Sequence, residues 1–392
     1  MPIHFAPLQG FTECAYRQAH FLFAGVTENG ANLGSGIAAY YTPFLRIEKG
    51  AAREKDLRDL QRDLEFIKSR QTNCHCENLA YGTTIDSSCH SPLDGESGRF
   101  YNVIPQVICR DAFEFRTLVD AIQKLKRDCG FAPDEVFPQI DINMGCPFPM
   151  QAKAGRGSGL LPRIDAVKEI FQEVATLSTP HCHPREGEDL ASSNPQQHVL
   201  KFSIKMRLGY TSPDECLALL PLLNDAPLTH VTMHPRLGIQ QYKGALDFNA
   251  FERFYAQCRH PLIFNGDITS INDIQAIAHR FPNLKGIMIG RGLLANPTLA
   301  AQYLAQYQAQ FQAQYKAQML PALLKIHDYV LSCHRSNLQG DSQVLDKIRP
   351  FWTYVTEIFQ DSPILPKRIY KKMVKSRSLS DYILALDEIR SG

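Results

Sequence analysis

Short apolar, β-prone runs alternate with longer helical stretches over the first three quarters of the chain. This alternation is typical of repeated βα units, in which helices join parallel strands. The eight runs are Ile3–Leu8, Gly36–Tyr41, Asn102–Cys109, Val136–Met144, Val199–Leu208, His230–His234, Leu262–Asn265 and Gly286–Ile289. Eight units predict an α/β fold of the (β/α)8, or TIM-barrel, type. An open doubly wound sheet is the alternative, but no Gly-x-Gly-x-x-Gly motif follows the first run.

The β-prone runs stop near Pro297, and the remaining sequence has a helical pattern. We therefore predict a catalytic barrel over residues 1–296 and a C-terminal all-α helical domain over residues 297–392. Early in that domain, aromatic residues recur every four positions at Tyr303, Tyr307, Phe311 and Tyr315. This spacing predicts a helical stripe that packs in a core.

Two polar stretches, residues 72–98 and 179–197, interrupt the repeating units and are predicted to be surface loops. The first carries Cys74-His-Cys76 and Cys89-His90, and the second carries His181-Cys-His183. Cys and His are zinc ligands, but these spacings fit no established zinc motif. We therefore predict no metal site.

Composition restricts the partners and the compartment. The formal charge of +2, from 42 Lys+Arg and 40 Asp+Glu, gives no global attraction to nucleic acid or acidic membranes. No apolar run approaches the roughly 20 residues that span a bilayer, so we expect a cytoplasmic protein that uses no membrane and acts as a monomer. The 11 cysteines suit reduced thiols better than a secreted disulfide framework.

Polar residues are predicted to point into the barrel. Alternate residues of a barrel strand face its interior, and functional groups collect at the C-terminal strand ends. This alternation directs inward Gln106, Asp141, Asn143, Ser203, Lys205, Thr232 and His234, and Asn265 ends the seventh run. Each residue alone could be a satisfied core residue. Their convergence favours a polar ligand, because an unpaired buried polar group costs several kcal/mol.

Glycines follow the seventh and eighth runs, in Asn265-Gly-Asp267 and Gly290-Arg-Gly-Leu-Leu294. Barrels commonly bind phosphate at these two loops, although two tight βα turns would also explain the glycines. A phosphate there, with polar donors along the barrel mouth, fits flavin mononucleotide (FMN).

Cys146 directly follows the fourth run. Most cysteines are inert packing residues, but one beyond a barrel strand is a candidate for catalysis. A thiol of ordinary pKa, about 8.5, is protonated at neutral pH and can act as a general acid. The glycine-rich segment 154–161 that follows is predicted to be a mobile loop.

Together these residues resemble the bacterial tRNA-dihydrouridine synthases. The matching motifs, in the family's order, are Ala6-Pro-Leu-Gln-Gly10, Asn143-Met-Gly-Cys-Pro147, Lys205-Met-Arg-Leu-Gly209, His234-Pro-Arg236 with Tyr242 and Gly244, Asn265-Gly-Asp267 and Gly290-Arg-Gly292. The resemblance covers about residues 1–297. This chain departs from the family at Pro235, where glycine is usual, and at Phe148-Pro149, where Ser-Lys is common.

The resemblance implies an FMN-dependent oxidoreductase that uses NADPH to reduce uridine in tRNA to dihydrouridine. It places Pro7 and Leu8 against the isoalloxazine ring, and Gln106, Asn143, Lys205 and His234 at its polar edge. Asn265, Asp267, Gly290 and Arg291 would surround the phosphate. Hydride from the flavin would add to C6 of the uracil, and Cys146 would protonate C5. The target uridine must leave its base stack to react.

A cluster of basic residues in the helical region predicts an RNA-binding surface. It comprises Lys367, Arg368, Lys371, Lys372, Lys375 and Arg377, with no acidic residue between them. Lys367, Lys371 and Lys375 would share one helical face and contact phosphates of the tRNA, although a merely solvated basic face is the alternative. Other functions left open are a flavin barrel that reduces a small molecule, a catalytically silent RNA-binding protein, and a synthase that acts on ribosomal RNA.

Overall fold

The computed structural model describes residues 1–26, 34–81, 101–132, 134–179, 199–305, 318–359 and 365–391, with residues 72–81 described as helix backbone only. One parallel sheet has the strand order β5-β2-β1-β11-β10-β9-β8-β7-β6. Its strands are β1 (Ile3–Phe5), β2 (Ile37–Tyr41), β5 (Val103–Ile104), β6 (Gln106–Val107), β7 (Gln139–Met144), β8 (Lys201–Gly209), β9 (Leu228–Leu237), β10 (Leu262–Asn265) and β11 (Gly286–Ile289). All eight predicted runs contain strand, and the predicted barrel is confirmed.

The third predicted run closes the barrel as two short strands rather than one. β5 pairs with β2 through Val103 and Ile104, whereas β6 pairs with β7 through Gln106 and Val107. Pro105 separates the two strands and has no N–H to continue a ladder. Its carbonyl accepts a hydrogen bond from the backbone N–H of Asp141 at 2.9 Å. The segment therefore changes partner at Pro105 and joins the two ends of the sheet.

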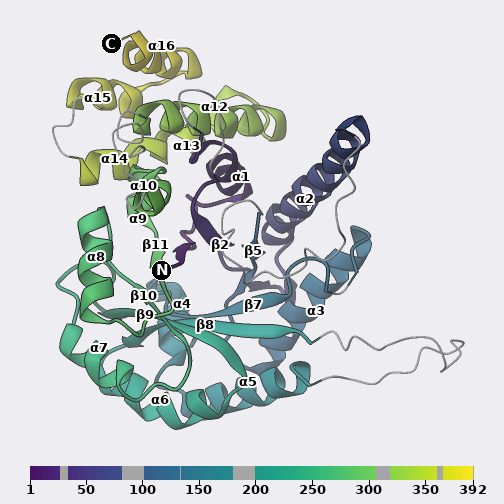
Figure 1. Ribbon diagram of the computed structural model, residues 1–392, viewed down its shortest axis with the longest axis vertical. Coiled ribbons are helices and arrows are strands. Elements are labelled where there is room, and N and C mark those ends of the chain that lie inside the picture. The colour runs from purple at the N-terminus through teal and green to yellow at the C-terminus, as the bar shows by residue number, and fades with distance from the viewer. Residues whose placement is uncertain are drawn as a thin grey trace, which may run out of the picture.

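Helices cover the outside of the sheet (Figure 1). The helices that accompany the barrel are α1 (Cys14–Phe23), α2 (Glu54–Tyr81), α3 (Ala112–Asp128), α4 (Pro149–Lys153), α5 (Ile164–Leu177), α6 (Asp214–Asp225), α7 (Phe248–Tyr255), α8 (Ile271–Arg280) and α9 (Arg291–Ala295). Side-chain caps set several of their starts: Asp111 accepts from the N–H of Glu114, and Ser270 and Asp273 form a capping box. These caps fix where α3 and α8 begin after the preceding loops.

The surface-loop prediction for residues 72–98 is wrong over residues 72–81. α2 runs without interruption from Glu54 to Tyr81, because this stretch contains neither glycine nor proline and each added residue adds one helical hydrogen bond. A hairpin that was not predicted, β3 (Ile47–Glu48) with β4 (Ala51–Ala52), precedes α2. The segments 82–98 and 180–197 lie outside the described residues, and so do the thiols of Cys74 and Cys76.

The C-terminal region is helical, as predicted, and gathers at one end of the molecule (Figure 1). Its elements are α10 (Leu299–Ala305), α12 (Met319–Asn337), α13 (Asp341–Ile348), the 3-10 helix η2 (Arg349–Trp352), α14 (Thr353–Ile358), α15 (Lys367–Lys375) and α16 (Leu379–Ser391). Trp352 and His327 both hydrogen-bond the hydroxyl of Tyr382, at 3.1 and 2.9 Å, inside this bundle. Tyr303 is buried, and the other three aromatic residues of the predicted stripe lie outside the described residues.

The helical region rests on the barrel through α12 and α13. The Tyr329 hydroxyl donates to Gln18 of α1 at 3.1 Å, and Lys347 pairs with Glu13 at 3.3 Å. α14 packs on α9, the helix that follows the last barrel strand. This contact brings the helical region to the edge of the barrel mouth. Among the described helices, none is both long and apolar enough to cross a membrane.

Candidate active site

A cavity of about 380 Å³ opens at the C-terminal ends of the barrel strands. Its lining includes every residue predicted for catalysis or cofactor binding: Pro7, Leu8, Gln106, Asn143, Cys146, Lys205, His234, Asn265, Asp267, Gly290 and Arg291. The loops after β1, β7, β9, β10 and β11 all contribute, because parallel strands deliver their carboxyl ends to one face of a barrel. The predicted catalytic and cofactor-binding residues thus line one cavity, whereas their roles remain predictions.

The floor of the cavity carries an ordered amide network. Asn143 donates through Nδ2 to Oε1 of Gln106 at 2.7 Å, and Gln106 donates through Nε2 to the Asp141 carboxylate at 2.7 Å. The hydroxyl of Ser203 donates to the same carboxylate at 2.6 Å. Asp141, Gln106 and Ser203 are fully buried, as the predicted inward alternation requires.

Lys205 presents an ammonium group to the cavity. Burial and the neighbouring guanidinium of Arg207 lower its pKa to about 8, although the carboxylate of Asp141 opposes this shift. Within the described residues, its ammonium has no hydrogen-bond or ion-pair partner. A buried cation without a protein partner attracts an anionic or carbonyl-rich ligand.

His234 stands at the end of the same inward alternation on β9 and is buried. Burial, together with the charges of Arg207, Lys205 and other nearby cations, holds its pKa well below the ordinary value. The imidazole is therefore neutral at physiological pH. It can donate one ring hydrogen bond to a ligand while its Nε2 lies 3.2 Å from a guanidinium nitrogen of Arg236.

Cys146 lies on the loop between β7 and α4. Its backbone N–H donates to Oδ1 of Asn143 at 2.8 Å, and its carbonyl accepts from both the N–H and the hydroxyl of Ser158, at 3.0 and 2.9 Å. Burial raises the pKa of its thiol, so the thiol stays protonated at neutral pH. A protonated thiol at the wall of a cavity can serve as a general acid.

The glycine-rich segment after Cys146 differs from its prediction as a mobile loop. Directly beyond α4, this segment forms the 3-10 helix η1 (Gly157–Leu160), and Ser158, Leu160 and Leu161 are fully buried. A Cβ added at Gly157 would lie 2.8 Å from the Cβ of Cys146. The segment therefore supports the cysteine from behind as packed structure.

Three arginines form the cationic wall of the cavity. Arg236 pairs with both carboxylate oxygens of Asp267, and Arg291 donates to the same carboxylate at 2.7 Å. Arg207 is buried and donates to the carbonyl oxygens of Gly145, at 2.9 Å, and Leu237, at 2.9 Å. Arg207 and Arg236 were not among the predicted site residues. The strand alternation could have identified them, because each lies two residues after a predicted inward residue: Arg207 after Lys205 on β8, and Arg236 after His234 on β9.

Two lining residues come from the helical region. Glu357 and Ile358 of α14 border the cavity opposite the barrel strands. No local motif marks these residues in the sequence. Their position follows from the packing of α14 on α9, and it makes the helical region part of the cavity wall.

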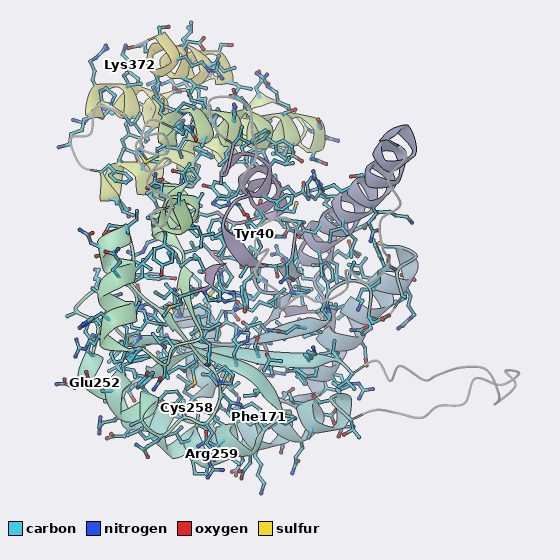
Figure 2. All side chains as sticks on the ribbon, in the orientation of Figure 1. Tyr40, Phe171, Glu252, Cys258, Arg259 and Lys372 are labelled. Atoms are coloured by element: carbon cyan, nitrogen blue, oxygen red, sulfur yellow. The ribbon has the colours of Figure 1, made fainter. Side chains whose placement is uncertain are left out.

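The predicted RNA-binding residues lie on and just after α15. Figure 2 shows Lys372 at the end of the molecule opposite Glu252 and Arg259. Arg368 and Lys372 pair with Glu388 of α16, whereas Lys371 and Lys375 are exposed and have no ion-pair partner among the described residues. Lys367 and Arg377 are also exposed. Ile369 and Met373 form the buried face, so the predicted helix is confirmed, with a basic face toward solvent. RNA binding by this face remains a prediction.

The potential metal ligands of the two insertions lie outside the described residues. Among the side chains that the structure describes, no group of three or more His, Cys, Asp and Glu residues could hold a metal ion.

Comparison with known proteins points to one family. The family model described as "Dihydrouridine synthase (Dus)" matches residues 119–372. The tRNA-dihydrouridine synthase B of Pasteurella multocida is 29% identical over 161 residues, which are 41% of this chain and 42% of that protein. The tRNA-dihydrouridine(16) synthase of Pseudomonas putida is 27% identical over 168 residues, 43% of this chain and 46% of that protein.

These alignments span about half, or slightly less, of the curated relatives' own lengths. Among solved structures, morphinone reductase resembles the chain with a TM-score of 0.44 at 10% identity, over 78% of this chain and 85% of that one.

Proposed function

The chain belongs to the dihydrouridine synthase family, and on this premise we propose that it reduces the C5=C6 double bond of uridine in tRNA to give dihydrouridine. The observation that carries the proposal is the cavity itself. It joins a protonated thiol, an unpartnered ammonium and a cationic wall at the mouth of a barrel. Each of these groups has a task in adding a hydride and a proton across an activated double bond.

The cavity suits FMN as the cofactor. FMN has a flat ring with a carbonyl-rich edge at one end and a phosphate at the other. Lys205, Gln106 and Asn143 offer N–H groups on one side of the cavity, where the carbonyl edge would lie. Arg291 and Arg236 lie together at the loop after β10, where the phosphate would bind. The volume of about 380 Å³ is within the range of small-molecule pockets.

Pro7 and Leu8 would lie against the flavin ring as its apolar support. Both residues line the cavity directly beyond β1. Leu8 is held by its backbone, which donates from N to the Thr12 hydroxyl at 2.8 Å. On the phosphate side, Asn265 donates to the Met288 carbonyl at 2.8 Å, which joins the ends of β10 and β11.

In the proposed reaction Cys146 gives its proton to C5 of the uracil. The hydride for C6 would come from a flavin held in the cavity and reduced by NADPH. The raised pKa of Cys146 keeps the proton on the thiol until the base develops negative charge at C5. Lys205 stabilises negative charge on the ligand beside it, and neutral His234 adds a hydrogen bond. The uridine has to leave its stack to enter the cavity, which costs least in an exposed RNA loop.

The basic face of α15 would hold the RNA. Phosphate contacts give affinity without sequence specificity, and Lys371 and Lys375 are exposed cations suited to that task. Since α14 both borders the cavity and belongs to the same helical region as α15, RNA bound there can reach the barrel mouth.

The proposal is tested anaerobically. The purified protein is reduced with NADPH, unmodified tRNA is added, and the visible flavin spectrum is followed. We expect tRNA, but neither orotate nor simple enones, to reoxidise the flavin and to gain two mass units per reduced uridine. Cys146→Ala should keep the flavin and slow reoxidation by about 100-fold or more. If tRNA does not reoxidise the reduced flavin, a small-molecule or ribosomal RNA substrate is favoured. A purified protein without flavin would overturn the cofactor assignment.

A further inference from the structure

A chain of hydrogen bonds runs beneath the floor of the cavity and links four strands or loops of the barrel. It begins at Ser203 on β8, passes through Asp141 on β7 and Gln106 on β6, and returns to Asn143 on β7. It ends at the backbone N–H groups of Gly145 and Cys146, which donate to Oδ1 of Asn143 at 3.1 and 2.8 Å. Ahead of this chain, Nε2 of Gln139 on β7 donates to the Ser203 hydroxyl at 2.8 Å.

The direction of every bond follows from the carboxylate. Ionised Asp141 can only accept, so Gln106 must turn its Nε2 toward it and its Oε1 toward Asn143. Asn143 must then offer Nδ2 to Gln106, which leaves Oδ1 for the N–H of Cys146. The remaining N–H of each amide is the group left for a ligand in the cavity. Without the carboxylate, nothing would determine which way the oxygen and the NH2 group of each amide point.

We propose that Asp141 is a positioning residue: its buried carboxylate fixes the orientation of the Gln106 and Asn143 amides and, through them, the backbone of Cys146. This inference deepens the proposed function and rests on it for its importance to catalysis. Asp141 does not line the cavity, and it acts on a ligand only through its neighbours.

The surroundings of Asp141 support this role. The charged and titratable groups that act on it are Lys205 from β8 and Tyr41 from β2. A fully buried carboxylate is costly unless its oxygen atoms accept hydrogen bonds, and Ser203 and Gln106 supply one bond to each oxygen. Because burial raises its pKa only to about 6, the group is still ionised at neutral pH.

Asp141→Asn tests the direction of the chain at nearly constant shape. Because the Ser203 hydroxyl accepts from Nε2 of Gln139 and directs its own proton at residue 141, the oxygen of the new amide faces Ser203. The new N–H then faces Gln106, which turns its Oε1 inward and presents Nε2 to Nδ2 of Asn143. The amide N–H groups of Gln106 and Asn143 then face each other, so the Asn143 amide rotates to direct its Oδ1 at Gln106. The backbone N–H groups of Gly145 and Cys146 thereby lose Oδ1 as their acceptor. We expect at least 10-fold faster amide hydrogen exchange at Gly145 and Cys146, measured by mass spectrometry on the full-length protein without flavin or RNA. We also expect about 10-fold weaker FMN binding.

Two further variants separate positioning from general damage. Ser203→Ala removes the donor on the other side of the same carboxylate and should leave exchange at Cys146 unchanged. In the double variant Asp141→Asn/Gln106→Glu, the new amide donates to a carboxylate that still accepts from Asn143. This double variant should restore slow exchange at Cys146, although it need not restore FMN binding.

Wild-type exchange rates at Gly145 and Cys146 in Asp141→Asn would overturn the proposal. Exchange at Cys146 that stays fast in the double variant Asp141→Asn/Gln106→Glu would also overturn it. If Asp141→Asn alone folds poorly, the double variant decides the question. Exchange is measured without flavin or RNA and thus does not depend on uridine reduction. If the exchange results hold and the wild-type protein does not reduce tRNA, the proposed function fails while the positioning role stands.

Discussion

Arg236 and Asp267 face each other at the mouth of the barrel, and the guanidinium of Arg236 bonds to both carboxylate oxygens of Asp267. Arg291 shares this carboxylate at 2.7 Å. Asp267 thereby orients two arginines. The charged residues that line the cavity are four cations, Lys205, Arg207, Arg236 and Arg291, and two carboxylates, Asp267 and Glu357. The excess of positive charge favours an anionic ligand.

Arg291→Ala should weaken the binding of FMN and spare that of riboflavin, which lacks the phosphate. Loss of a charge-assisted hydrogen bond costs about 1.5–3 kcal/mol, which corresponds to a rise in Kd of about 10- to 100-fold. Flavin fluorescence titrations measure both affinities. Arg280→Ala, which removes an exposed arginine paired with Glu252 on the outer helices, is the matched control. An equal loss for riboflavin would show that Arg291 acts elsewhere than on the phosphate.

Lys205→Met should lower the reduction potential of the bound flavin. The ammonium stabilises negative charge on the ligand beside it, and its removal should shift the two-electron potential by on the order of −30 to −60 mV. Since burial and Arg207 lower the pKa of Lys205 to about 8, the variant and the wild type should differ less at alkaline pH. Dye-coupled photoreduction measures the potential. Lys201→Met, at the exposed start of the same strand, should change nothing, and an unshifted potential in Lys205→Met would refute the assignment.

The repeating pattern and strand alternation sufficed to predict the barrel and its mouth. Ser203, Lys205 and Arg207 alternate on β8, and the same rule applied to β7 and β9 predicts Asn143 and His234 correctly as inward residues. The rule works because side chains of a strand must point to opposite faces. This alternation depends only on the order of residues along a strand, so a single sequence is enough to predict it.

Features that depend on distant contacts escaped prediction. Pro105 splits a strand whose two halves pair with opposite ends of the sheet, and the sequence shows only an apolar run containing a proline. Glu357 borders the cavity only because α14 packs on α9. The helix α2 extends into residues 72–98, a stretch whose Cys, His, Ser and Gly content had indicated a surface loop. In each case tertiary contacts or continuous helix propagation outweighed local composition.

Reversing the charge of both Lys371 and Lys375 to Glu should weaken tRNA binding about 10- to 100-fold. Each lysine that contacts a phosphate releases counterions, so the slope of log affinity against log salt should fall by about two. Filter binding over a salt series measures both quantities. The control reverses Lys124 and Lys168, which are exposed on the barrel helices α3 and α5. Equal affinities of the variant and the wild type at every salt concentration would exclude α15 from the RNA site.

Stability should report the ionisation of Asp141. Burial raises its pKa to about 6, above the roughly 3.9 of an unfolded chain, so the folded protein binds this proton more tightly. The stabilising contribution is therefore full below the unfolded pKa and is lost as the pH rises through about 6. Lowering the pH from about 7.5 to about 5 should favour wild type over Asp141→Asn by about 1 kcal/mol.

Urea titrations of the two flavin-free proteins at both pH values measure this difference, and the pH dependence of all other groups cancels in the comparison. A difference in the free energy of unfolding that does not change with pH would mean that Asp141 titrates outside this window.

Gly157→Ala should disable the reaction while the protein remains folded. Gly157 has φ +59°, and an added Cβ would lie 2.7 Å from the carbonyl oxygen of Cys146 and 2.8 Å from its Cβ. The cysteine must therefore move, and a displacement of even 1 Å in a catalytic group can cost about 100-fold in rate. Gly155→Ala is the matched control, because Gly155 also has positive φ, at +74°, but the three atoms nearest to its added Cβ all belong to the flexible side chain of Arg163.

Both substitutions strain the backbone to a similar degree, and only Gly157→Ala pushes on Cys146. Single-turnover reoxidation by tRNA, together with the melting temperature of each variant, separates the two effects. Equal rates in the two variants at equal melting temperatures would show that the reaction does not depend on the exact position of Cys146, which contradicts the proposed proton transfer.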